Sequence, residues 1–124
     1  MTKLRSVILE PICEAWCKTL LKESVEKYDE MLLQGDPRQM LPEFSGGAAV
    51  FQSLGREHQL ALLELFKVVA VDTASQLLGN LDGSSYIEGV EGDFSVQYEG
   101  DDVTGYLQEC FLGKVEDCGY LPSK

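Results

Sequence analysis

The stretch that decides the fold is REHQLALLELFKVVAVDTASQLL, residues 56–78. It contains neither proline nor glycine, so it predicts a helix that begins near Arg56 and ends at Leu78, before Gly79. Leucine, valine and phenylalanine occupy most of the predicted circumference. Four of the polar residues share one narrow strip: Glu57, Glu64, Lys67 and Ser75. Such a helix must be covered on several sides, either at the centre of the domain or at the seam of a homodimer, and we favour the seam.

An earlier segment predicts a second long helix, from Pro11 to Gln34. Pro11 suits the first position of a helix, where its missing N–H costs nothing, and Gly35 ends the segment. Spacings of three and four place one set of residues on the face that we expect to be buried. The set is Cys13, Cys17, Leu20, Leu21, Tyr28, Met31 and Leu32.

The connection between these two helices is rich in residues that favour turns. Residues 35–38 predict a turn, and Leu41-Pro42 and Gly46-Gly47 keep the connection from forming one long helix. We read the glycine pair as a turn with backbone crowding. A short helix near Ala48–Leu54 is expected after it.

After Gly79 the chain is punctuated by glycines and the helical periodicity ends. Residues 94–98 alternate between apolar and polar, and a turn at 99–102 leads to Val103-Thr104, which predicts a hairpin. A short helix should follow over Tyr106–Leu112 and stop at Gly113, with a fraying tail from Asp117. The sequence therefore predicts a single α+β domain, residues 1–124. Its mainly helical core has two long helices plus a short one, with a small C-terminal antiparallel β-hairpin.

Charge is distributed unevenly along this acidic chain, whose net charge is −11. Residues 81–124 hold ten acidic and two basic residues, whereas residues 1–80 are nearly balanced. Repulsion disfavours nucleic acid and anionic membranes, and attraction favours a basic protein surface. The candidate partner-binding residues form the densest acidic run: Glu88, Glu91, Asp93, Glu99, Asp101 and Asp102. The alternative is that the acidic residues only maintain solubility.

The composition predicts a cytoplasmic globular protein. Apolar residues make up 44% of the chain, and no apolar run approaches the roughly 20 residues of a membrane span or resembles a signal peptide. The four cysteines should therefore be reduced thiols, with Cys13 and Cys17 packed in the core. A zinc site with Cys110 and Cys118 is not favoured, because the C-x3-C and C-x7-C spacings match no common structural zinc pattern.

The segment 80–91 has some features of a calcium-binding loop. Oxygen-bearing side chains stand at the ligand positions of such a loop: Asn80, Asp82, Ser84, Glu88 and Glu91. The first position is not Asp, however, and the sixth is Ser85 where the loop needs glycine. We expect an ordinary turn here and leave calcium as an open alternative.

Enzymatic activity is not expected. His58 is the single histidine, in the first turn of the predicted helix 56–78, and no motif supplies an activated nucleophile near it. We therefore assign no catalytic residue, no metal ligand and no cofactor.

Residues 77–85, 92–94 and 105–112 resemble small uncharacterised acidic bacterial proteins. In size, acidity and lack of catalytic motifs the whole chain is also similar to immunity proteins, which neutralise bacterial toxins. This resemblance implies an interaction domain of the immunity or inhibitor type that docks a basic partner through the acidic C-terminal hairpin region. The alternatives are a structural or regulatory homodimer built on helix 56–78, or a module that binds a metal or a small molecule.

Overall fold

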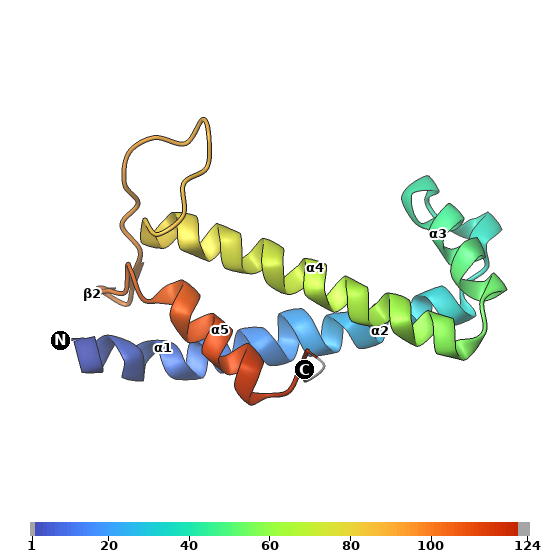
Figure 1. The fold of residues 1–124 in the computed structure, drawn as a ribbon, viewed down its shortest axis with the longest axis horizontal. Helices are drawn as coiled ribbons and strands as arrows, with labels where there is room; N and C mark the ends of the chain where they lie inside the picture. The colour runs from blue at the N-terminus through green and yellow to red at the C-terminus, as the bar shows by residue number, and fades with distance from the viewer. Residues whose placement is uncertain (1, 122–124) are drawn as a thin grey trace.

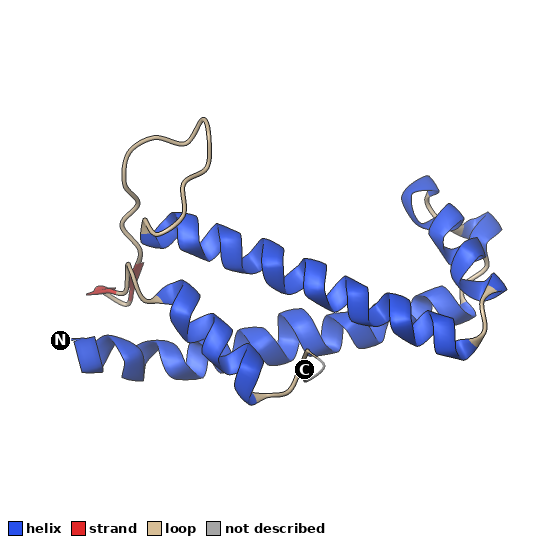
Figure 2. Cartoon of the chain, in the orientation of Figure 1, coloured by secondary structure: helices blue, strands red, loops and turns tan. Residues whose placement is uncertain are grey.

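A computed structural model describes residues 2–121, with side chains from residue 5 onward, and it has the predicted mainly helical α+β fold. Figures 1 and 2 show a long helical body with a small hairpin near one end. The elements in chain order are α1 (Thr2–Trp16), the π-helix η1 (Cys17–Glu23), α2 (Ser24–Gln34), the 3-10 helix η2 (Pro37–Gln39), α3 (Pro42–Ser53), α4 (Arg56–Asp82), β1 (Gln97–Tyr98), β2 (Asp101–Asp102) and α5 (Leu107–Asp117).

The first helix starts well before Pro11, so the predicted start at that residue was wrong. Pro11 lies inside α1 and is exposed. Its ring removes one backbone hydrogen bond and crowds the preceding turn, which costs about 3 kcal/mol in a helix interior. Leu9 and Cys13 on either side of it are almost fully buried. Their burial holds the segment helical and offsets the cost of the proline.

The helix widens into a π-helix at η1, and this change keeps one buried stripe aligned. Leu9, Cys13, Cys17 and Leu21 are each four residues apart, and all are buried. In an α-helix, residues four apart are rotated by about 40° around the axis, so such a stripe would drift away from the core. The wider turns of a π-helix reduce that drift.

Two of the residues predicted for this buried face are exposed instead. Leu20 is 63% exposed and Tyr28 is 47% exposed, so their assignment to the core was wrong. The buried stripe continues at a spacing of four residues from Cys17 to Leu21, so Leu20 lies beside the stripe and not in it. The prediction that Cys13 and Cys17 pack in the core is confirmed.

The paired glycines Gly46-Gly47 lie inside α3, so the predicted turn was also wrong. Pro42 starts this helix at a position that tolerates proline. Ala48 and Phe51 are buried in a small cluster with residues from α2 and α4. That packing outweighs the low helix propensity of glycine. A Cβ added at either glycine would meet no atom within 4 Å, so the backbone is not crowded there.

The prediction that the fold-deciding helix begins near Arg56 is confirmed, but α4 continues past Gly79 to Asp82. Gly83, with a φ of 80°, provides the left-handed cap that ends it. Gly79 has a different use. A Cβ there would crowd the Ser85 hydroxyl and lie 2.7 Å from Nε2 of Gln108, so glycine makes room for these two side chains.

Two residues of the polar strip of α4 face the rest of the protein, and several apolar side chains of the helix face outward although Leu63 and Val71 are buried. Nζ of Lys67 lies 5.6 Å from the centre of the Tyr120 ring. Ser75 accepts hydrogen bonds from Nε2 of Gln108 at its carbonyl (2.9 Å) and its hydroxyl (3.1 Å). Leu65 and Val69 are more than half exposed. Lys67 and Ser75 of the polar strip therefore both have partners in the C-terminal segment.

The main core lies where α5 packs against both α1 and α4 (Figure 1). The predicted terminal helix extends through Gly113 to Asp117, because Phe111 and Val115 are both buried. The tail does not fray immediately after it, contrary to the prediction. Tyr120 is only 7% exposed and belongs to the main core. Residues 122–124 of that tail lie outside the described residues.

The hairpin is shorter than predicted and its strands are shifted. Gln97 pairs with Asp102 and Tyr98 with Asp101, so the two aspartates belong to a strand rather than to the turn. The turn consists of Glu99 and Gly100, whose φ angles are 49° and 85°. Two consecutive positive φ angles are typical of the type I′ turn, whose twist matches that of the paired strands.

Candidate interaction site

A long loop, residues 84–96, joins α4 to the hairpin and stands out from the helical body (Figure 1). It is tied down at both ends. The Ser84 hydroxyl contacts the Gly79 carbonyl at 3.2 Å, and the Val96 N–H donates to Oγ1 of Thr104 at 2.7 Å. Between them, a single turn bond runs from the Val90 N–H to the Ile87 carbonyl at 3.0 Å. The loop therefore presents side chains outward from two fixed ends.

All six predicted partner-binding residues are exposed in the structure. Three of them lie in the loop, one in the hairpin turn and two in β2: Glu88, Glu91, Asp93, Glu99, Asp101 and Asp102. Asp102 accepts a hydrogen bond from the Thr104 N–H at 3.0 Å. Hydrogen bonding from Thr104, together with the charge of Arg5, holds the pKa of Asp102 below its usual value. Asp102 therefore also helps to shape the end of the hairpin.

The other five acidic side chains make no hydrogen bond or ion pair with any residue from 5 to 121. Their charges are not neutralised within the described part of the chain. They add to the negative potential of this region, which carboxylates projecting into solvent can present to a positively charged surface.

Exposed aromatic side chains share this region, and the sequence interpretation had placed no functional weight on them. Tyr86 is 77% exposed, and Phe94 and Tyr98 are each more than 40% exposed. Tyrosine and phenylalanine are enriched at protein interfaces, where they supply apolar area at a low cost in conformational entropy. The sequence feature that could have indicated their exposure is their position in an acidic, glycine-rich segment, since such segments are rarely buried. We define the acidic–aromatic surface as the six acidic residues named above together with Tyr86, Phe94 and Tyr98.

Asp82 has a structural use that the calcium interpretation did not anticipate. Its carboxylate accepts hydrogen bonds from the N–H groups of Gly105 (2.8 Å), Leu107 (3.1 Å) and Gln108 (2.8 Å). These bonds cap the start of α5 from the end of α4, although the residues are far apart in sequence. Asn80 also lies in α4, and its amide donates to the Ser85 carbonyl at 3.2 Å. The segment 80–91 thus has a helical start in place of a calcium-binding loop.

The remaining candidates for metal binding or catalysis are dispersed. No group of three or more His, Cys, Asp or Glu side chains able to hold a metal ion occurs within the described residues. His58 is exposed in the first turn of α4, as expected from its position. Cys13 and Cys17 are buried, Cys110 is half-buried and Cys118 is exposed, and all four are free thiols.

The outward side of α4 is a second unusual surface. It carries exposed apolar side chains along much of the helix: Leu65, Val68, Val69 and Leu77. We call these four residues the α4 apolar face, whereas the exposed Leu60 and Phe66 line hollows against η1 and α2. Exposed apolar patches of this kind are typical of protein contacts.

Comparisons with protein-family models, with curated proteins and with solved structures find no match to this chain. Within the described residues, none of the helices combines the length and the apolar character that a membrane span needs.

Proposed function

We propose that this chain is a protein–protein interaction domain that docks a basic partner through its acidic–aromatic surface. The observation that carries the proposal is the combination, on one projecting segment, of unpaired carboxylates with exposed aromatic side chains such as Tyr86. The carboxylates would steer a basic surface into contact. The aromatic side chains would then act as anchors in apolar pockets of the partner. An inhibitor of the immunity-protein type, acting in the cytoplasm, would be one form of such a domain.

The two kinds of side chain should contribute differently to binding. Exposed charges act mainly on the association rate and its salt dependence. An aromatic anchor acts on dissociation, and truncating one commonly costs about 2 kcal/mol or more when it is buried in an interface. We therefore expect Tyr86→Ala to raise the dissociation rate, and charge reversal in the loop to lower the association rate.

Selection of peptides from a random display library, at physiological salt, tests the proposal even while the partner is unidentified. Peptides that bind the wild-type protein should be rich in Lys and Arg. They should lose binding to the variant Glu88→Lys/Glu91→Lys and retain it for the control Glu26→Lys/Glu30→Lys. The control makes the same change in net charge on exposed positions of α2. Peptides that bind both variants equally would contradict the proposal.

The choice of these residues follows from the structure. Asp102 caps the hairpin through Thr104, so its reversal would disturb the loop itself. Asp29 forms an ion pair with Arg56, with 2.7 Å between Oδ2 and Nη2, so it is a poor control. Glu88 and Glu91 are exposed and have no such partners within the described residues.

A homodimer through the α4 apolar face is the second candidate function. The observation that favours it is that Leu65 and Val69 face outward while Lys67 and Ser75 face the core. Light scattering at high micromolar concentration should give the mass of a dimer for the wild type and of a monomer for Leu65→Glu/Val69→Glu. The control Lys27→Glu, which makes the same change in net charge at an exposed position of α2, should remain dimeric. A wild-type protein that stays monomeric would remove this candidate.

A further inference from the structure

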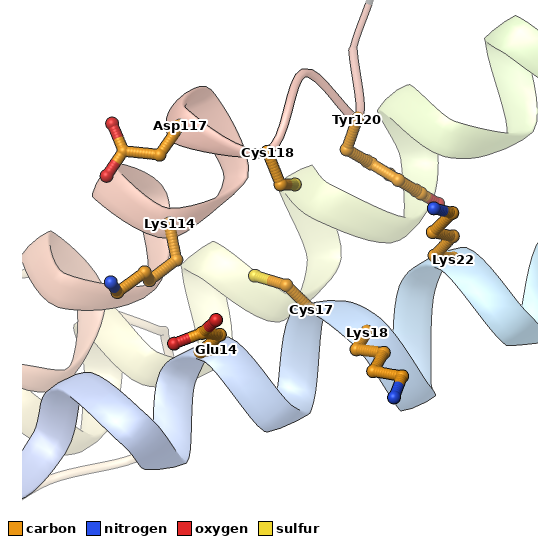
Figure 3. A pocket seen from close by; sticks show the side chains of 8 residues that line it. All are labelled: Glu14, Cys17, Lys18, Lys22, Lys114, Asp117, Cys118 and Tyr120. Carbon is orange, nitrogen blue, oxygen red and sulfur yellow. The ribbon is translucent and has the colours of Figure 1, made fainter.

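A cavity of about 330 Å³ lies between η1 and the C-terminal end of α5. Figure 3 shows it with two thiols, of Cys17 and Cys118, directed into the space between these elements. The two residues are far apart in the sequence, and the packing of α5 brings them together. Neither the acidic–aromatic surface nor the α4 apolar face includes them.

The two thiols differ in how easily a reagent can reach them. Cys17 is only 4% exposed, whereas Cys118 is exposed at the end of α5, where its thiol contacts the Val115 carbonyl at 3.4 Å. Burial raises the pKa of Cys17 to about 11, and the neighbouring Cys118 adds to the rise, while the positive charge of Lys114 opposes it. Cys118 is therefore placed to react first with a dissolved molecule, and Cys17 to react second and more slowly.

The charges that line the cavity are unusual for this acidic protein. Lys18, Lys22 and Lys114 line it, with Glu14 and Asp117 as the acidic groups. Lys114 is also paired with Glu10, with 3.0 Å between Nζ and Oε1. With Glu10 counted, the three lysines are matched by three carboxylates, so this region is neutral in a chain whose net charge is −11. A negatively charged small molecule would be repelled less here than elsewhere on the protein, and Lys18 and Lys22 are the charges that would attract it.

We propose that Cys17 and Cys118 form a dithiol site that is oxidised to a disulfide by a small disulfide compound carrying carboxylates. The Cys118 thiolate attacks one sulfur of the compound, the S–S bond breaks, and one small thiolate leaves. Cys17 then gives its proton to water and attacks the Cys118 sulfur, and the second small thiolate leaves. Two protein thiols are oxidised and one small disulfide is reduced to two thiols, a transfer of two electrons. The lysines hold the carboxylates near Cys118 during the first step.

The dianionic reagent 5,5′-dithiobis(2-nitrobenzoate) is a suitable probe, because each released thiolate is coloured. The wild-type protein should release one equivalent rapidly from Cys118 and a second more slowly as Cys17 displaces it. Peptide mapping by mass spectrometry should then find a Cys17–Cys118 disulfide. In Cys17→Ala the adduct on Cys118 should persist, and in Cys118→Ser the slow second release should disappear. A stable adduct on Cys118 of the wild type, or a disulfide to another cysteine, would overturn the proposal.

The role assigned to the lysines has its own test. Lys18→Gln/Lys22→Gln should slow the first step with the anionic probe about threefold or more, because attraction of an anion raises its association rate. It should leave the rate with the neutral compound 2-hydroxyethyl disulfide unchanged. Lys27→Gln is a control for the loss of an exposed positive charge outside the cavity lining. Equal slowing with both compounds, or slowing with neither, would overturn the preference for an anionic oxidant. The exposed variant Cys118→Ser keeps the core intact, so the test does not depend on the folding of Cys17→Ala.

Discussion

Asp82 at the end of α4 bonds to the start of α5 through its carboxylate. Replacing this one side chain should therefore lower the free energy of unfolding substantially. Replacement by alanine removes the acceptor of three hydrogen bonds, between 2.8 and 3.1 Å long, and leaves N–H groups of Leu107 and Gln108 without it. Loss of a helix N-cap costs about 1–2 kcal/mol, and loss of a negative charge at a helix N-terminus about 0.3–1 kcal/mol. We therefore expect Asp82→Ala to lower the free energy of unfolding by about 2–3 kcal/mol.

Urea unfolding followed by circular dichroism measures this loss. Asp82→Asn keeps one oxygen, which can accept from Gly105 and Leu107, and loses both the charge and the acceptor of the Gln108 N–H, so it should cost about 1–2 kcal/mol. Asp72→Ala, at an exposed position of the same helix, should change the stability by less than about 0.5 kcal/mol. If Asp82→Ala proves no more costly than Asp72→Ala, the inference that this carboxylate couples α4 to α5 is refuted.

Three further predictions concern packing and charge. Gly79→Ala should destabilise the protein by about 1 kcal/mol, because its Cβ would crowd Gln108. Gly46→Ala should stabilise the protein by about 0.5–1 kcal/mol, because its Cβ would lie in open space and alanine has the higher helix propensity. Thermal unfolding of both variants measures the two effects, and a change of the same sign in both would contradict the prediction. Phe51→Ala, at a nearly fully buried position of the smaller cluster, should cost about 3–4 kcal/mol in urea unfolding, and a loss below about 1 kcal/mol would show that this cluster adds little. Hydrogen bonding from Arg56 lowers the pKa of Asp29 in the folded state, so this stabilisation is present above the usual aspartate value of about 4 and is lost as the pH falls through the lowered pKa. The stability difference between wild type and Asp29→Asn should therefore shrink from pH 7 to pH 2, and a constant difference would contradict this.

Those parts of the fold that depend on strong local patterns were predictable. The start of α4 at Arg56 follows from a long run without helix breakers, and the burial of Cys13 and Cys17 follows from their spacing. The hairpin was expected from alternation, although its pairing is shorter than the pattern indicated. The exposure of the six acidic residues was expected because charged side chains in turns are costly to bury.

Errors arose where a residue that breaks helices was overridden by packing between distant segments. Pro11 lies inside α1 because its neighbours Leu9 and Cys13 are buried. Gly46-Gly47 lies inside α3, whose Phe51 is held by the smaller cluster. Gly79 does not end α4, because Leu81 beyond it packs against the main core and Asp82 bonds to the start of α5. Local preferences are worth about 1–3 kcal/mol, which the burial of one or two large side chains can outweigh.

The side of α4 that faces the core could not be predicted from the sequence, for a different reason. Periodicity identifies which residues share a face of a helix, but it does not say which face meets the core. Here Lys67 and Ser75 face inward because Tyr120 and Gln108, far along the chain, supply their partners. Other apolar side chains of α4 are left outward, and because Leu65 is 56% exposed, burying it would gain about half of the 1.5–3 kcal/mol of a fully buried leucine. Leu63 and Val71 of the same helix are buried in the core, so α4 has apolar side chains on both its inner and its outer side, and the outer ones are those that the proposed homodimer would cover.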